Sequence, residues 1–311
     1  MIRYVVGAIY LLIGLTALPL HAVLLYIFLS NKKLRSLPSY QLMIQIDIGD
    51  CVQVVNHVYT GLMTLTGSNF CIHLEKFFGG FVNAVWISMM LLTFLLAVNR
   101  LDVITDLKTG INRTIFYNVT AVLCWLFGLG LFTCYMTPYT GLEYNNDDFY
   151  WSFLENGTWN EFVQDAETLS TIPALLTSFI LYIIIFITVV AKKRSYSLRS
   201  STISAQELQL ILQAFIIFSY KSALICCWHY GDYFLPDSSW TPIAINIMWM
   251  VDGVVNPVVY FIINSRVSEW LFCSSHRYNF RGVREKLFKM FAAKERTNAV
   301  CVSHVATLTT T

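Results

Sequence analysis

Charged residues are scarce in this chain of 311 residues. Asp, Glu, Lys and Arg make up 13% of it and hydrophobic residues 56%, whereas an average soluble domain has about 25% charged residues. The mean hydropathy is +0.57. This composition excludes an ordinary soluble domain and predicts an integral membrane protein.

Motifs of catalysis are also missing. The sequence has no P-loop, no metal-ligand cluster at a standard spacing and no evident pair of nucleophile and base. These absences argue against an enzyme such as an intramembrane hydrolase. The net charge of +2 gives no reason to expect a nucleic acid as partner.

Seven long apolar runs are present instead. At 1.5 Å rise per residue, a helix of about 20 residues crosses the ~30 Å hydrocarbon layer of a bilayer. The runs are Tyr4–Leu29, Tyr40–Leu65, Phe77–Val98, Phe116–Met136, Ile172–Ala191, Leu208–Trp228 and Pro242–Ile263. They predict an all-α integral membrane fold, a seven-transmembrane helix bundle in one domain.

Lysine and arginine are distributed unequally between the connectors. Eighteen of the 21 fall in the first, third and fifth connectors and after the seventh run. The longest connector, Pro138–Ser170, has neither, and it carries the acidic residues Glu143, Asp147, Asp148, Glu155, Glu161, Asp165 and Glu167. Because basic loops stay in the cytoplasm, the N-terminus is predicted outside and the C-terminal tail inside.

The segment after the seventh run has two predicted parts. Apolar residues between Val267 and Phe272 fit a short amphipathic helix on the inner leaflet, which completes a membrane domain over residues 1–273. Cys273 at its end is a candidate palmitoylation site. Residues 274–311 form a basic cytoplasmic tail that we expect to be flexible.

Two further modifications are predicted outside. Asn156 begins the sequon Asn-Gly-Thr in the acidic connector, where N-glycosylation takes place in secreted and membrane proteins. Cys71 lies just before the third run and Cys134 near the outer end of the fourth, and the acidic connector contains no competing cysteine. These two thiols are candidates for a disulfide, which requires Cα atoms within about 7 Å.

Polar residues interrupt the apolar runs at bilayer depth. Asp252, Asn256 and Pro257 lie in the seventh run, and Asp47 and Asp50 share one helical face of the second. A carboxylate in lipid is costly and Pro257 removes a backbone donor, so these residues should face neighbouring helices. A proline-kinked helix of an unrelated transporter or channel has the same features. Against a transporter, the prolines are scattered singly instead of marking two related halves.

Landmarks in four helices resemble the rhodopsin-like G-protein-coupled receptors. The segment 256–260, NPVVY, fits the NPxxY pattern of their seventh helix, and Asp50 fits the aspartate of their second. Arg100, in Asn-Arg-Leu, stands where that family has Asp/Glu-Arg-Tyr, and Trp125 falls near its helix-four tryptophan. A snorkelling anchor at the membrane surface is the alternative for Arg100.

Departures from that pattern are informative. His21 stands where the first helix usually has Asn, Asn99 replaces the acid before the arginine, and Trp228 lacks the following proline. With the AVNR end of helix three and a Gln-bearing helix six, the chain resembles the nematode serpentine chemoreceptors of class x or class t.

The resemblance implies a receptor that transmits binding of an external small-molecule or peptide ligand to a cytoplasmic heterotrimeric G protein. It implies the plasma membrane, and sensory cilia, as the location. It assigns G-protein coupling and activation to Asn99, Arg100, Asn256, Pro257 and Tyr260. It assigns an interior polar cluster, which often holds a sodium ion in relatives, to Asp50, Asp252 and Asn256. No other cofactor and no metal is expected.

The outer half carries aromatic walls with a few polar groups, as small-ligand pockets do. The candidate pocket residues are Asn83, Trp86, Lys221, Trp228, His229, Asn246 and Trp249. An aromatic belt at the membrane interface is the competing interpretation. Lys221 would pair with a helix-seven carboxylate, bind an anionic ligand or snorkel.

Two positions argue against particular receptor classes. Alignment with the resembled family puts Val82 where amine receptors keep an aspartate and Met250 where opsins keep the retinal lysine. An amine receptor or an opsin is therefore disfavoured.

Overall fold

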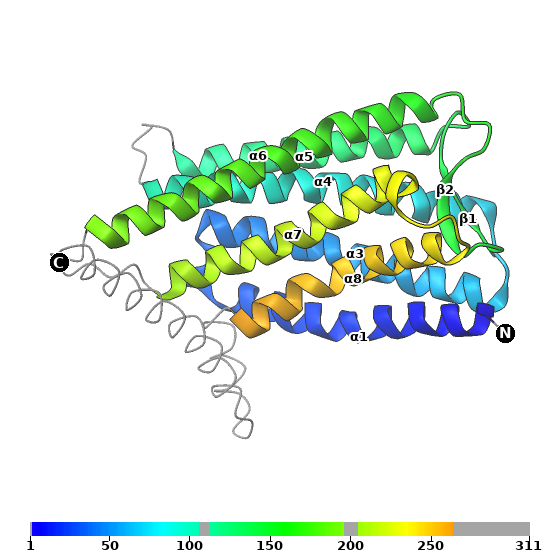
Figure 1. The fold of residues 1–311 in the computed structure, drawn as a ribbon, viewed down its shortest axis with the longest axis horizontal. Coiled ribbons are helices and arrows are strands. Elements are labelled where there is room, and N and C mark those ends of the chain that lie inside the picture. Colours follow the sequence, from blue (N-terminus) through cyan, green and yellow to red (C-terminus); the bar gives the residue numbers. More distant parts are fainter. Residues whose placement is uncertain (1, 106–111, 196–204, 264–311) are drawn as a thin grey trace, which may run out of the picture.

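Seven long helices lie side by side along one axis in the computed structural model, which describes residues 2–105, 112–195 and 205–263 (Figure 1). They are α1 (Ile2–Ser30), α3 (Pro38–Thr66), α4 (Ile72–Thr105), α5 (Arg113–Tyr135), α6 (Asn160–Ser195), α7 (Ala205–Phe234) and α8 (Trp240–Ile263). A single-turn helix, α2 (Lys32–Arg35), follows α1, and a hairpin of β1 (Leu142–Asn145) and β2 (Tyr150–Phe153) lies between α5 and α6. Each predicted apolar run therefore corresponds to one long helix.

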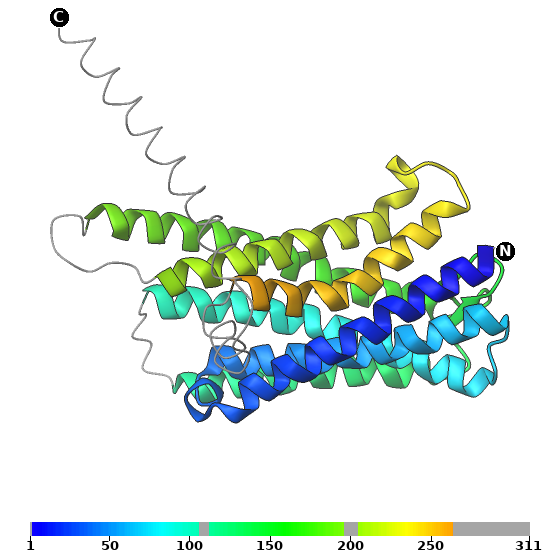
Figure 2. The ribbon, with the colours of Figure 1, turned by 90° about the horizontal axis from the view of Figure 1, so that it is seen from below.

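Five of the described helices, α1, α4, α5, α6 and α8, are long and apolar enough to cross a membrane. The other two long helices, α3 and α7, have 29 and 30 residues and lie in the same bundle (Figure 1). The N-terminus, the hairpin and the α7–α8 connector lie at one end, here called the hairpin end (Figure 2). The charge distribution predicts that this end faces outside.

Local sequence explains where helices begin and end. Pro38 occupies the first turn of α3, where its missing N–H is not needed. Gly67 ends the helix with φ +64°, a left-handed conformation that glycine adopts without strain, and its N–H bonds to the Met63 carbonyl. Asn112 caps α5, because its side-chain oxygen accepts hydrogen bonds from the backbone N–H groups of Thr114 and Ile115.

The connector Pro138–Ser170 is more ordered than the sequence suggested. Besides the hairpin, it contains the first three turns of α6, which begins at Asn160. Val163, Glu167 and Thr171, spaced four residues apart, are all buried. The helical period of the apolar run thus extends back through the acidic stretch, so the acids on the opposite face remain exposed while Glu167 enters the bundle.

The predicted disulfide is not formed: Cys71 and Cys134 are free thiols, the first exposed and the second half-buried. Cys71 precedes Ile72, the first residue of α4, and is exposed, whereas Cys134 lies within α5. The amphipathic segment, Cys273 and the tail 274–311 lie outside the described residues.

Candidate functional site

The hairpin closes one end of the bundle. Its residue Trp151 donates its indole N–H to Thr60 Oγ1 at 3.1 Å, and the Tyr144 hydroxyl lies 2.6 Å from Thr64 Oγ1. Between its strands, the carbonyl of Phe149 accepts a 2.8 Å bond from the Tyr10 hydroxyl. Burial raises the pKa of the Tyr144 hydroxyl above its already high ordinary value, so this group is a neutral hydroxyl throughout the physiological pH range.

A small cavity lies beneath the hairpin, among α4, α6, α7 and α8. Its lining residues are Asn83, Trp86, Glu167, Leu224, Trp228 and Trp249. Its volume of about 20 Å³ is enough for one water molecule. The structure therefore brings together four of the predicted pocket residues around a pocket that is closed in this conformation.

Glu167 is the acidic group of this pocket. Its residue exposure is 2%, and Oε2 accepts a 3.3 Å hydrogen bond from the Asn83 amide. That amide also donates to the Tyr135 hydroxyl at 2.7 Å. Nε2 of His229 lies 4.0 Å from Oε1, beyond hydrogen-bonding distance. Within the described residues, no other basic group lies within ion-pair distance of this carboxylate.

The remaining predicted pocket residues lie elsewhere. Asn246 is buried beneath the hairpin, where its amide donates to the Phe149 carbonyl at 3.4 Å. Lys221 is deeper in the bundle, with Nζ 2.5 Å from Asp252 Oδ2. It therefore does not line the cavity beneath the hairpin. Of its three predicted roles, the pair with a carboxylate of the seventh long helix, α8, is the one observed.

An interior polar cluster surrounds this ion pair. Asn256 donates its amide N–H to Asp50 Oδ2, and both residues are buried. His21 Nδ1 lies 2.7 Å from Asp47 Oδ1, and its Nε2 lies 2.6 Å from the Gly253 carbonyl. Because both neighbours of the imidazole are acceptor groups, one proton must be held between His21 and Asp47 in addition to the one facing Gly253.

The implied sodium ion can be tested against these contacts. Asn256 uses its N–H toward Asp50, and Asp252 Oδ2 is occupied by the Lys221 ammonium, so the predicted ligand set is partly engaged. Asp47 Oδ2 and Asp50 Oδ1 are buried without a partner. Ligand atoms of His21, Asp47 and Asp50 lie within 4.8 Å of one another. Carboxylate oxygens suit a hard cation, so Asp47 and Asp50 are the residues that fit it.

Arg100 and Tyr260 line a second small cavity, at the end opposite the hairpin. It has a volume of about 20 Å³, and Tyr182, Gln213 and Asn256 line it too. The guanidinium Nη2 lies 3.3 Å from Met43 Sδ. Arg100 is only 9% exposed, which disfavours an anchor that reaches for lipid headgroups.

Asn99, the residue before this arginine, is also buried. Its side-chain oxygen accepts a hydrogen bond from Ser39 Oγ. Within the part of the chain that the structure describes, Arg100 has no carboxylate partner at ion-pair distance. The acid–arginine pair of the resembled family is therefore absent, as the Asn99 substitution predicts.

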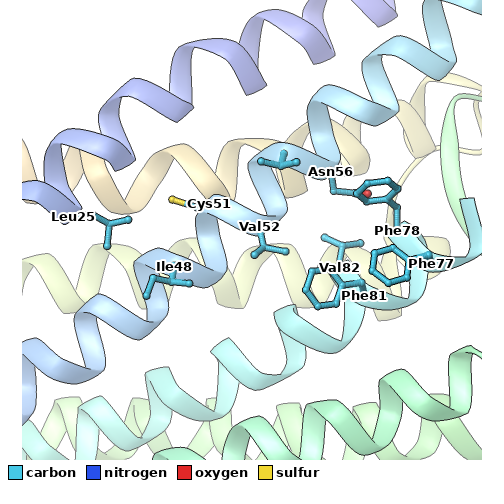
Figure 3. A pocket seen from close by; sticks show the side chains of 10 residues that line it. Leu25, Ile48, Cys51, Val52, Asn56, Phe77, Phe78, Phe81 and Val82 are labelled. Carbon is cyan, nitrogen blue, oxygen red and sulfur yellow. The ribbon is translucent and has the colours of Figure 1, made fainter. Parts of the chain in front are cut away.

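A third cavity, of about 300 Å³, lies between α1, α3 and α4 (Figure 3). Figure 3 shows Phe77, Phe78 and Phe81 from α4 on one side and Ile48 and Val52 from α3 on the other. The lining is almost wholly apolar, completed by Leu25, Cys51, Val55, Asn56 and Val82. Its chemistry suits an apolar chain better than a polar ligand, and sequence reasoning did not anticipate it.

Two side chains of these sites, Glu167 and His21, are absent from the predicted site residues. Glu167 was grouped with the acids of the outer connector, although the i, i+4 spacing of Val163, Glu167 and Thr171 marks a buried stripe. His21 was noted only as a departure from asparagine. Its spacing carries no signal for Asp47, because that contact is made between different helices.

Comparison with known proteins agrees with the geometry. The family model described as serpentine type 7TM GPCR chemoreceptor Srt matches residues 1–278. No curated protein matches the chain. Squid rhodopsin, a solved structure, matches with a TM-score of 0.73 at 13% identity, over 88% of this chain and 80% of that one. At this identity the likeness shows the fold.

These findings confirm the predicted all-α seven-helix membrane fold, and they give no support to a transporter or channel. Between the two nematode classes that the sequence resembles, the family model selects class t. The chain belongs to the Srt family of serpentine seven-transmembrane G-protein-coupled chemoreceptors.

Proposed function

We propose that this chemoreceptor binds a small external ligand beneath the hairpin and transmits its occupancy to a heterotrimeric G protein at the opposite end. It does so at the plasma membrane, in the sensory cilia that the family resemblance implies. Its action is a change of helix packing and involves no catalysis. The closed, aromatic pocket favours a small molecule over a peptide.

One observation carries this proposal: a single face of α8 contacts all three sites. Trp249 lines the pocket, Asp252 holds Lys221, and Tyr260 lines the cavity of Arg100. Asn256, between them, bonds to Asp50. These four α8 residues are all buried, at spacings close to whole helical turns.

A rotation or shift of α8 would therefore change the three sites together. A ligand that binds one packing of α8 better than another shifts the population toward it, and only by that difference in affinity. The buried ion pair and the Asp50–Asn256 bond are discrete contacts that either form or break, which suits a two-state element.

We further propose that a sodium ion, where one binds in the interior, is held by Asp47 and Asp50. Their orphan carboxylate oxygens support this assignment. A sodium titration of the purified receptor, followed by its melting temperature, tests the assignment, because Asp47→Asn or Asp50→Asn should abolish any sodium-dependent rise.

Ligand-dependent nucleotide exchange tests the main proposal. A compound panel screened in reporter cells yields an agonist, which is then added to purified receptor in vesicles with a G-protein heterotrimer. We expect agonist to accelerate exchange, and Asn256→Ala to retain surface expression while losing most of the acceleration. Substrate flux or ionic current in vesicles without a G protein, together with no exchange, would refute the proposal.

A further inference from the structure

We propose that the ligand is a small organic cation, an amine or quaternary ammonium compound that also carries a hydrogen-bond acceptor, and that Glu167 binds its charge. This inference rests on the proposed pocket beneath the hairpin and adds the chemical class of its ligand. It assigns to Glu167 a role in ligand recognition that residue types and spacing alone do not indicate.

The charge of the pocket is the first argument. A buried carboxylate is costly unless it is paired, and Glu167 has one amide donor and no cation within hydrogen-bonding distance among the described residues. Lys221, the cation that sequence reasoning placed here, is engaged by Asp252 at 2.5 Å. The pocket therefore offers a ligand one carboxyl group and, among its described lining residues, no lysine or arginine, which favours a cationic ligand and disfavours an anionic one.

The aromatic lining is the second argument. Trp86, Trp228 and Trp249 surround the same cavity as Glu167, and the rings of Trp228 and Trp249 lie 5.5 Å apart in a T-shaped arrangement. Indole faces attract organic cations, and tryptophan is the strongest of the aromatic residues in this interaction. A carboxylate within such an aromatic lining is the chemistry that recognises an ammonium group.

Unpartnered donors supply the third argument. The indole nitrogens of Trp86 and Trp249 are buried and have no hydrogen-bond partner. Buried polar groups in native proteins are nearly always hydrogen-bonded, and each of these N–H groups can only donate. An acceptor oxygen on the ligand, such as a hydroxyl, ether or ester, would satisfy one or both.

Val82 does not contradict this inference. The residue that amine receptors use is an aspartate on helix three, and Val82 cannot replace it. Here the carboxylate comes from α6 instead, and Asn83, the neighbour of Val82, holds it in place. The sequence evidence against an amine receptor concerns one position, whereas the pocket charge comes from another helix.

The pocket must change shape when the ligand binds. A volume of about 20 Å³ admits no organic cation without rearrangement, so binding must displace side chains or open the hairpin. The ligand then stabilises a conformation other than this one, which is what a signal requires.

The test compares ammonium compounds with neutral isosteres. Tetramethylammonium, choline and ethanolamine are titrated into purified receptor in nanodiscs without a G protein, each beside the isostere in which carbon replaces nitrogen. Binding is followed by the change in tryptophan fluorescence, since three tryptophans line the pocket. We expect at least one ammonium compound to bind at least about tenfold more tightly than its isostere, as the loss of one desolvated charge contact allows.

Variants identify the carboxylate responsible. Glu167→Gln preserves shape and the bond to Asn83 but removes the charge, so it should abolish the preference for the cation. Glu167→Asp retains the charge and should retain the preference with weaker binding, which guards against a folding defect. Glu161→Gln removes an equal charge from an exposed position on α6 and should leave binding unchanged.

The outcomes separate this inference from the receptor proposal. A preference for the cation that Glu167→Gln leaves intact would overturn it, and so would wild-type receptor that binds none of the three compounds better than its isostere. A neutral agonist from the panel screen that drives nucleotide exchange would contradict the assignment of a cationic ligand and would still support the receptor proposal. Cation binding that depends on Glu167 without any nucleotide exchange would support the ligand class while contradicting G-protein coupling.

Discussion

The ammonium of Lys221 lies 2.5 Å from the carboxylate of Asp252, and both side chains are almost completely buried. The pair joins α7 to α8 between the pocket beneath the hairpin and the cavity of Arg100. Asp252, on α8, is thus the acceptor in an interhelical ion pair with Lys221, on α7. Because of this ion pair, substituting one partner and substituting both should change the stability of the receptor by different amounts.

Lys221→Met alone should strongly destabilise the receptor. It leaves the Asp252 carboxylate buried without its cation, which costs about 3–5 kcal/mol and lowers the melting temperature by about 10 °C. Asp252→Asn alone should have a similar effect. The double variant Lys221→Met/Asp252→Asn should recover most of the loss, because no uncompensated charge remains. Thermal unfolding of wild type, the two single variants and the double variant in detergent measures the interaction free energy between Lys221 and Asp252.

Asp102→Asn is the matched control for that cycle. Asp102 lies 3.1 Å from Arg113, whose side chain is 38% exposed, and such pairs contribute less than about 1 kcal/mol. Its melting temperature should stay within a few degrees of wild type. A Lys221→Met variant as stable as Asp102→Asn would show that Lys221 reaches solvent or lipid headgroups instead of Asp252.

The sequence predicted the helices and part of the interior cluster. Hydropathy predicts the spanning helices because every backbone polar group in lipid must be hydrogen-bonded within the protein. Asp50 and Asn256 are polar at bilayer depth, which indicates that they point into the bundle. The sequence indicates that the Lys221 side chain points into the bundle. It leaves three roles open for this residue, because spacing along one helix does not identify a partner on another.

Other features could not be predicted for definite physical reasons. Glu167 lies in an acidic stretch whose polarity suggests a solvated loop, and only its helical register distinguishes it from Glu161. The hairpin strands have four residues each, too few for a clear alternation pattern. The prediction of a disulfide between Cys71 and Cys134 was wrong. A disulfide depends on the distance between the two Cα atoms, and the sequence does not contain that distance.

Gly128→Ala should destabilise the bundle. A Cβ at Gly128 would lie 1.9 Å from Ser88 Oγ and 2.7 Å from the Ala84 carbonyl, so α5 would have to move away from α4. Small residues permit such close helix contacts in membranes, and overpacking costs about 1–3 kcal/mol. Gly130→Ala, on the same helix with nothing within 4 Å of its Cβ, should be neutral or stabilising by about 0.5–1 kcal/mol. Equal melting temperatures for the two variants would contradict the packing described here.

Asn156→Gln should remove the single glycan that we expect on the receptor. Asn156 is exposed in the turn between β2 and α6 at the hairpin end, which the charge distribution places outside. The variant should migrate like wild type treated with a glycosidase. Asn112→Gln, at the sequon that caps α5 at the other end, should not change migration. A glycan on Asn112 would invert the predicted orientation.

Trp151→Phe should loosen the hairpin. It keeps the aromatic packing but removes the 3.1 Å bond from the indole to Thr60. A hydrogen bond of this kind contributes about 1 kcal/mol, so local opening should become roughly fivefold more frequent. Hydrogen exchange of the backbone amides in residues 142–153 measures it. Tyr150→Phe, a half-buried hairpin position, serves as control, and equal exchange in the two variants would exclude the Thr60 bond as a tether.

Arg100→Lys should separate a switch from a membrane anchor. Lysine places a cation at the same position but lacks the planar guanidinium that contacts Met43 Sδ and borders Tyr260. We expect surface expression near wild type and agonist-driven nucleotide exchange reduced at least about tenfold, with Arg100→Ala inactive. If Arg100 were only an anchor, lysine would serve nearly as well.

Asn99→Asp tests the same switch from the other side. An aspartate can still accept the hydrogen bond from Ser39, and it adds a carboxylate beside Arg100, which has none among the described residues. An acid–arginine pair would restrain the arginine, so basal nucleotide exchange should fall below that of wild type while expression is kept. Asn99→Gln, which adds no charge, should leave basal exchange higher than Asn99→Asp. Full signalling by Arg100→Lys, together with unchanged basal exchange in Asn99→Asp, would show that Arg100 acts only as a membrane anchor.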